Sequence, residues 1–154
     1  MKYLHTTLND FINEDNIYDN DKFKIWFSDS AMVDKSGNPI KFYHGTNQEF
    51  DIFDDSKIGS STDPGWLGTG FYFYTDINEA YQYGKVSSYY LYIKEPYYAT
   101  DQENEYLANE NSFDASTEFT RNLINDGYDG VYYNGNLRGE TVVFKASQIW
   151  KIKE

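Results

Sequence analysis

Gly65-Trp66-Leu67-Gly68-Thr69-Gly70-Phe71-Tyr72-Phe73-Tyr74-Thr75-Asp76 is the stretch around which the rest of the chain is organised. Three glycines fall within six residues, and four aromatic residues follow directly. Glycine adopts backbone angles that other residues avoid, and it lets a ligand approach the main chain. Aromatic and β-branched side chains favour a strand, and aspartate favours the start of a helix. We therefore expect a glycine-rich loop, a strand over residues 71–75 and a helix over residues 77–84 that Asp76 caps.

The predicted strand has two chemically different faces, because successive residues of a strand point to opposite sides of the sheet. Tyr72 and Tyr74 share one face, and Phe71 and Phe73 share the other. Two interpretations are open at this point. The run is either a core strand after an irregular turn, or a strand whose tyrosine face lines a ligand site.

Length and composition predict a single domain over residues 1–154, since 40% of the 154 residues are hydrophobic and can build one core. No run approaches the roughly 18 apolar residues that a membrane helix needs. Residues 1–7 lack the apolar centre of a signal peptide. We therefore expect a cytoplasmic protein that makes no membrane contact.

The chain has no cysteine, which excludes disulfides, thiolate nucleophiles and cysteine zinc sites. Because His5 and His44 are the two histidines, we also predict no metal site. The formal charge of -12 disfavours a nucleic acid target, whose phosphates require cations. Solubility is the simplest role of this charge. Attraction to a basic protein partner and mimicry of nucleic acid are the alternatives.

Hydrophobic periodicity predicts two helical pieces within residues 7–29, separated by polar breaks at 13–16 and 19–21. Residues 1–40 are expected to form an N-terminal helical segment that packs on the domain. A further amphipathic helix is expected over residues 115–125. The remaining strands are expected at 40–43, 87–93, 128–133, 141–144 and 149–152. Strands and helices do not alternate regularly, so the predicted class is α+β, with mostly antiparallel sheets and helices at the sides.

Three short segments place polar chemistry at a strand end or beside a glycine. They are Tyr43-His44-Gly45-Thr46, Gly68-Thr69-Gly70-Phe71-Tyr72-Phe73 and Gly139-Glu140-Thr141-Val142-Val143-Phe144. Together and in this order they resemble the ADP-ribosyltransferase superfamily. The resemblance implies an ADP-ribosyltransferase-like split antiparallel β-sheet core with flanking helices.

The His-Tyr-Glu branch, shared by diphtheria-type toxins and poly-ADP-ribose polymerases, is the more similar one. In that branch a histidine stands in a His-Gly-Ser/Thr step. A tyrosine follows in a Gly-x-Gly-x-Tyr-Phe segment, and a glutamate opens a late strand. His44, Tyr72 and Glu140 match these three positions.

A more specific similarity extends over roughly residues 22–152. The segments 23–27, 91–96 and 127–131 resemble ADP-ribosyltransferase domains of phage and mobile-element polyvalent proteins. This likeness implies a phage or toxin-type effector that acts in a host cytoplasm on an unidentified protein target.

The resemblance implies that NAD+ is the co-substrate. Cleavage of its nicotinamide–ribose bond produces an oxocarbenium-like sugar, which the Glu140 carboxylate can stabilise as in glycoside hydrolysis. Before cleavage nicotinamide is a flat cationic ring, which Tyr72 can attract by stacking and cation–π contacts. The family position of a second stacking tyrosine falls on Tyr83, with Tyr81 as its competitor.

The same resemblance implies that His44 bonds a ribose hydroxyl of the adenosine half and that the Gly45 main chain bonds the nicotinamide amide. Thr46, Gly68 and Gly70 complete the implied NAD+-binding set.

Two departures from the family pattern limit the analogy. Arginine-modifying relatives place an acidic residue or Gln two positions before the glutamate, whereas this chain has Arg138 there, so arginine is not the expected acceptor. Ala80 stands nearest the place where some polymerases carry a serine.

The loop over residues 57–67 is expected to act as a lid, and residues 134–139 to influence the choice of acceptor. A short chain favours a mono-ADP-ribosyltransferase over a chain-elongating polymerase. An NAD+ glycohydrolase, and an inactive acidic binding or inhibitor protein on the same fold, are the alternative functions.

Overall fold

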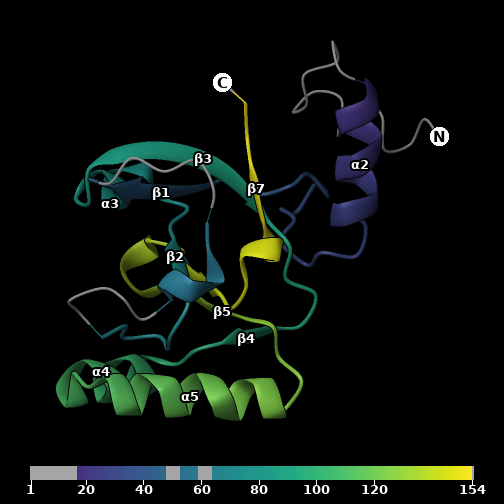
Figure 1. Ribbon diagram of the computed structural model, residues 1–154. Coiled ribbons are helices and arrows are strands. Elements are labelled where there is room, and N and C mark those ends of the chain that lie inside the picture. The colour runs from purple at the N-terminus through teal and green to yellow at the C-terminus, as the bar shows by residue number, and fades with distance from the viewer. Residues whose placement is uncertain (1–16, 48–52, 59–63, 154) are drawn as a thin grey trace.

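A computed structural model of the protein describes residues 17–47, 53–58 and 64–153. The chain forms two β-sheets with helices on either side, which confirms the predicted α+β class and the split, mostly antiparallel core (Figure 1). The first sheet has the order β1-β3-β7 and consists of β1 (Phe42–Thr46), β3 (Lys85–Leu91) and β7 (Ile149–Lys151). The second has the order β2-β6-β5-β4 and consists of β2 (Phe71–Phe73), β6 (Glu140–Val143), β5 (Gly130–Tyr133) and β4 (Pro96–Tyr98). Neighbouring strands are antiparallel except β4 and β5, which are parallel.

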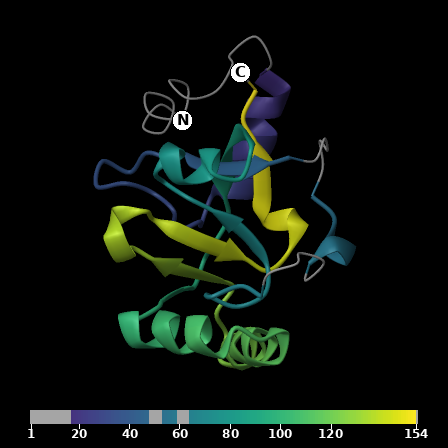
Figure 2. The ribbon, with the colours of Figure 1, turned by 90° about the vertical axis from the view of Figure 1, so that its left-hand side faces the viewer.

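The helices cover opposite ends of this double sheet. They are α2 (Ile17–Phe27), α3 (Ile77–Tyr81), α4 (Asp101–Glu110) and α5 (Phe113–Asn125), with 3-10 turns η1 (Asp55–Lys57), η2 (Gly135–Leu137) and η3 (Ala146–Gln148). Figures 1 and 2 show α4 and α5 together below the four-stranded sheet, with α2 at the far end of the molecule. In the described part of the chain, no helix has the length and apolar character needed to cross a membrane.

The main core lies between the two sheets. It contains the buried side chains Met32, Phe42, Phe53, Phe71, Phe73, Tyr89, Leu91, Ile93 and Val143. This placement confirms that Phe71 and Phe73 share the inward face of β2, as the alternation predicted. A separate cluster anchors α2, whose Phe23 and Phe27 pack against Tyr90 of β3.

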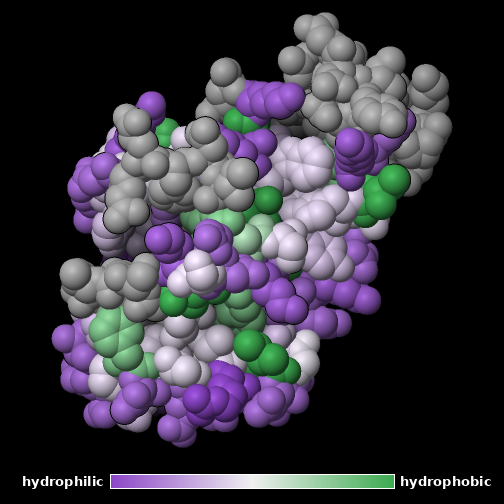
Figure 3. Space-filling view, viewed as in Figure 1, coloured by the Kyte–Doolittle hydropathy of each residue, from purple (hydrophilic) through white to green (hydrophobic). Residues whose placement is uncertain are grey.

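The opposite face of the four-stranded sheet packs against α5. Its buried side chains are Leu67, Leu123, Val131, Val142 and Phe144, and Tyr72 packs against them. The outer surface of the molecule is mostly hydrophilic, with hydrophobic residues in small separate patches on the face in Figure 3. That surface agrees with the formal charge of -12.

One backbone pairing joins the two sheets. Tyr43 in β1 and Tyr74, directly after β2, exchange both hydrogen bonds, at N···O distances of 2.7 and 2.9 Å. The pairing brings the C-terminal half of β1 against β2. The candidate site residues of β1 and β2 therefore lie next to one another.

One expectation about secondary structure was wrong, and two elements were not predicted. Residues 19–21 lie inside α2 rather than breaking it. Residues 101–110, for which no helix was predicted, form α4, and a capping box between Thr100 and Glu103 starts this helix. The parallel strand β4, which begins at Pro96, was also not predicted. The earlier helical piece of the 7–29 expectation lies in residues 7–16, outside the described residues.

The glycine-rich loop is tied to α5. Gly68 has a φ of +99°, which favours glycine, and the Thr69 N–H donates to the Thr120 Oγ1 at 2.7 Å. A Cβ on Gly68 would overlap that hydroxyl. The loop can therefore approach α5 only because residue 68 has no side chain.

We predict that Gly68→Ala destabilises the protein more than Gly37→Ala. Gly37 has a similar φ of +84°, but a Cβ there meets nothing within 4 Å. Gly37→Ala should lower the free energy of unfolding by about 1–2 kcal/mol, from backbone strain alone. Gly68→Ala should lose about a further 1–3 kcal/mol, because the new methyl group overpacks the contact with Thr120. Urea unfolding measures both, and equal losses would contradict the packing account.

Candidate active site

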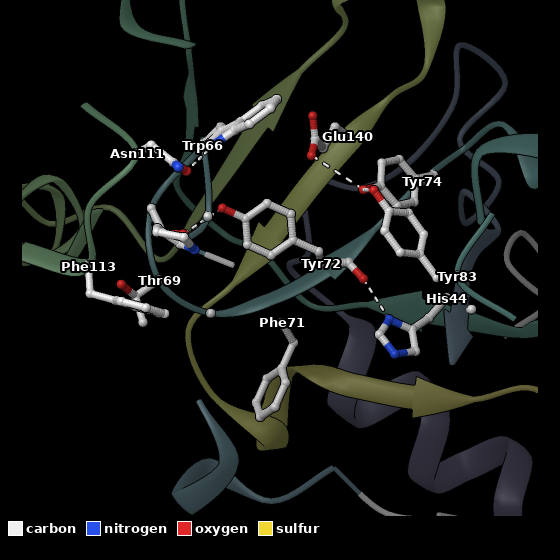
Figure 4. Close-up of a pocket in the computed structure, with 15 residues that line it drawn as sticks. His44, Trp66, Thr69, Phe71, Tyr72, Tyr74, Tyr83, Asn111, Phe113 and Glu140 are labelled. Atoms are coloured by element: carbon white, nitrogen blue, oxygen red, sulfur yellow. Dashed lines mark hydrogen bonds between the residues drawn. The ribbon is translucent and has the colours of Figure 1, made fainter. Parts of the chain in front are cut away.

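A cavity of about 490 Å³ opens where β1, β2 and the start of β6 face the α4–α5 turn (Figure 4). Of the residues predicted to bind substrate, seven line it: His44, Gly45, Gly68, Gly70, Tyr72, Tyr83 and Glu140. Thr46 is not on the cavity wall; it lies in β1 opposite Lys85. Tyr81 is 58% exposed and also off the wall, so Tyr83 is the second tyrosine that the fold brings to the cavity.

Aromatic packing and one hydrogen bond hold the His44 side chain in place. Its ring packs edge-on against Phe53, at a centroid distance of 5.0 Å, and against Phe73 at 5.4 Å. Its Nδ1 lies 2.7 Å from the carbonyl oxygen of Tyr72, so this nitrogen carries the proton. Burial lowers the pKa of His44, against the opposing effect of that hydrogen bond. The neutral ring then has Nε2 as an acceptor, which suits a hydroxyl donor.

Tyr72 supports the glycine-rich loop through its side chain. Its hydroxyl accepts from the Leu67 N–H at 3.0 Å and donates to the carbonyl of Gly68. Burial raises the pKa of Tyr72, which keeps the phenol neutral. In Figure 4 the ring lies at the centre of the cavity, between Trp66 and Tyr74. Tyr72 therefore has a structural role in the loop in addition to the stacking role predicted for it.

Glu140 is the first residue of β6, and its side chain is 12% exposed. One carboxylate oxygen, Oε1, lies 3.7 Å from the Arg138 guanidinium, and the other, Oε2, lies 3.4 Å from the Tyr74 hydroxyl. Burial raises the pKa of Glu140, while the Arg138 charge and the Tyr74 hydrogen bond lower it and the Glu79 charge raises it. Each oxygen thus has one partner that favours the ionised form.

Tyr83 and Tyr74 form a parallel aromatic pair, with centroids 5.9 Å apart and an interplanar angle of 7°. Tyr83 is 50% exposed, whereas Tyr74 is 6% exposed. A planar ligand ring can therefore stack on Tyr83 beside the carboxylate. Tyr74 was not among the predicted site residues, although its alternation with Tyr72 was a signal that it shares the same face.

The opposite wall of the cavity comes from the α4–α5 turn. The Trp66 indole donates to the Asn111 Oδ1 at 3.2 Å, and Asn104 donates to the Trp66 carbonyl at 3.0 Å. Phe113, the first residue of α5, lies on the same wall. Asn111 and Phe113 were not predicted as site residues, and the overlooked signal was the Thr-x-x-Glu start of α4.

Gly45 is closely packed against α3, and a Cβ at this position would overlap the Ala80 carbonyl oxygen. Ala80 itself is fully buried. Packing against α3 is thus one reason why position 45 requires glycine, independent of any ligand. In the described residues, no three His, Asp or Glu side chains group in a way that could hold a metal ion.

The arrangement places an oriented carboxylate beside a parallel pair of tyrosine rings. Glu140 is the one carboxylate among the described residues of the wall, and no Lys or Arg side chain lines it there. Such a site attracts a planar cationic ring and stabilises positive charge that grows next to it.

Comparison with known families agrees with this geometry. A family described as ADP-ribosyltransferase in polyvalent proteins matches residues 34–154. No curated protein matches the chain. Members of such families use NAD+ as the substrate. Because the match covers most of the chain, this protein belongs to the family of ADP-ribosyltransferase domains found in polyvalent proteins.

Proposed function

We propose that the protein is a mono-ADP-ribosyltransferase, which cleaves NAD+ at the nicotinamide–ribose bond and transfers ADP-ribose to a protein target. The observation that carries this proposal is the Glu140 carboxylate, held between Arg138 and Tyr74 at the wall of a cavity that His44 and Tyr83 also line. Family membership supports the reaction class, and the cavity supports the placement of substrate.

In the proposed mechanism, nicotinamide stacks on Tyr83 and its amide bonds the main chain of Gly45. The neutral His44 accepts a hydrogen bond from a ribose hydroxyl of the adenosine half. Glu140 accepts one from the 2′-hydroxyl of the ribose that reacts. The C–N bond breaks, its electron pair leaves with nicotinamide, and the carboxylate stabilises the oxocarbenium-like sugar until the acceptor nucleophile attacks C1.

The acidic charge of the chain supports a basic protein as the target, because opposite charge accelerates and orients association. A phage- or toxin-type role in a host cell is part of the same proposal, and membership of the polyvalent-protein family supports it. The proposed role includes action in the host cytoplasm.

The experiment that tests the function is incubation with NAD+ labelled in its adenine half, with and without bacterial lysate. Free nicotinamide and label on macromolecules are both measured. Nicotinamide release together with a discrete labelled protein supports the transferase. Release without labelled protein indicates the NAD+ glycohydrolase, and neither signal indicates an inactive binding protein.

We predict that Glu140→Gln folds normally and lowers nicotinamide release by at least about 100-fold. The amide is close in shape but carries no charge, so it loses the stabilisation of the developing cation. Glu118→Gln is the matched control, since this exposed glutamate of α5 lies away from the cavity and should leave the rate unchanged. Wild-type turnover in Glu140→Gln would reject the role of Glu140.

We also predict that Tyr83→Ala raises KM for NAD+ by about tenfold, because it removes the exposed face on which the nicotinamide ring stacks. The control is Tyr106→Ala, which removes a tyrosine of α4 that is 57% exposed. Initial rates over a range of NAD+ concentrations give both constants. An unchanged KM in Tyr83→Ala, with the control also unchanged, would show that nicotinamide binds elsewhere.

A further inference from the structure

Tyr74 contacts Glu140 from a central position, but no step of the proposed mechanism assigns a role to its hydroxyl. Its main chain forms the pairing with Tyr43 that joins the two sheets, and its side chain is 6% exposed. Its ring lies parallel to the ring of Tyr83, and its hydroxyl lies 3.4 Å from both the Glu140 Oε2 and the Tyr83 hydroxyl (Figure 4). A buried phenol is therefore fixed between the proposed stacking residue and the proposed catalytic carboxylate.

The number of protons available limits which of these groups can donate a hydrogen bond. A phenol has one proton to donate, and an ionised carboxylate can only accept. The Tyr74 hydroxyl faces two acceptors, the Tyr83 oxygen and the Glu140 carboxylate, and the charge of the ionised carboxylate makes Glu140 the stronger of the two. Burial and the neighbouring Glu140 charge both raise the pKa of Tyr74, so its proton stays in place for this bond.

The other carboxylate oxygen is held by Arg138, whose own position is fixed through the main chain. The Arg138 carbonyl accepts from the Thr75 N–H at 3.1 Å and the Asp76 N–H at 3.2 Å. Residues 74–76 thus orient both sides of Glu140, one side directly through Tyr74 and the other through Arg138. A carboxylate with a fixed partner on each oxygen loses rotational freedom before substrate binds.

We infer that Tyr74 is a positioning residue, whose hydroxyl holds the Glu140 carboxylate in its reactive orientation and links it to the tyrosine on which the substrate ring stacks. This inference rests on the proposed function, and it adds a residue that acts through Glu140 rather than on substrate. Binding of a planar ring to Tyr83 is then transmitted to the carboxylate through two hydroxyl groups.

The positioning role of Tyr74 predicts a change in the pH dependence of the reaction rate when its hydroxyl is removed. The titratable and charged groups that shift the pKa of Glu140 are Arg138, Tyr74 and Glu79, while the Glu140 charge in turn raises the pKa of Tyr72 and of Tyr133. Of these, the Tyr74 hydrogen bond lowers the pKa of Glu140. Removing that hydroxyl must therefore raise the pKa of Glu140, so the ionised, active form is lost at a higher pH as the solution is acidified.

The test is Tyr74→Phe, which removes the hydroxyl and keeps the ring, its stack on Tyr83 and the backbone pairing. The matched control is Tyr97→Phe, because the Tyr97 hydroxyl donates to Glu103 at 2.6 Å outside the cavity. We expect Tyr74→Phe to lower kcat for nicotinamide release by about tenfold, with a smaller change in KM, since a bond to a charged group is lost. We also expect the acid limb of its pH–rate profile to move to higher pH, and Tyr97→Phe to change neither.

A second readout does not depend on turnover. Carbon-13 NMR titration of the side-chain carboxyl groups, with the Glu140 signal assigned by its loss in Glu140→Gln, reports the pKa of Glu140 directly. A raised pKa of Glu140 in Tyr74→Phe, and a smaller rise in Tyr83→Phe, support the chain of hydroxyls even if the wild-type protein fails to cleave NAD+. An unchanged pKa of Glu140 in Tyr74→Phe overturns the inference, as does an unchanged kcat in a wild-type background that does cleave NAD+.

Discussion

The site depends on the pair of backbone hydrogen bonds between Tyr43 and Tyr74, at 2.7 and 2.9 Å. Because these bonds hold β1 against β2, the next residue of β1, His44, reaches the Tyr72 carbonyl. The same bonds fix the backbone from which the Tyr74 side chain reaches Glu140. This pairing of β1 with β2, together with the pairing of β2 with β6, gathers groups from three strands that are far apart in the sequence.

Burial decides the chemistry of the gathered groups. It lowers the pKa of His44 and raises the pKa of Glu140, so the histidine is kept neutral and the carboxylate requires help to stay ionised. Arg138 and the hydroxyl of Tyr74 provide that help from opposite oxygens. The carboxylate is consequently both oriented and poised near a stacking surface. An oriented carboxylate beside a stacking surface is what the stabilisation of a sugar cation needs.

Much of this arrangement follows from local patterns, and the rest depends on contacts between distant segments. The strand at residues 71–73, its Phe71 and Phe73 core face and the cap at Asp76 come from side-chain alternation and turn chemistry. Only the family motif predicted that Glu140 would lie in the same cavity as His44 and Tyr72. Strand pairing between distant segments leaves no local signal in the sequence. The α4–α5 wall was missed because an acidic composition concealed a capped helix.

The most direct measurement of the central claim is the crystal structure of the Glu140→Gln variant with NAD+ bound. The account predicts the nicotinamide ring against Tyr83 and the 2′-hydroxyl of the adjoining ribose facing residue 140. It also predicts the adenosine ribose beside His44. NAD+ bound outside this cavity, or bound within it with the nicotinamide ribose remote from residue 140, would contradict the account.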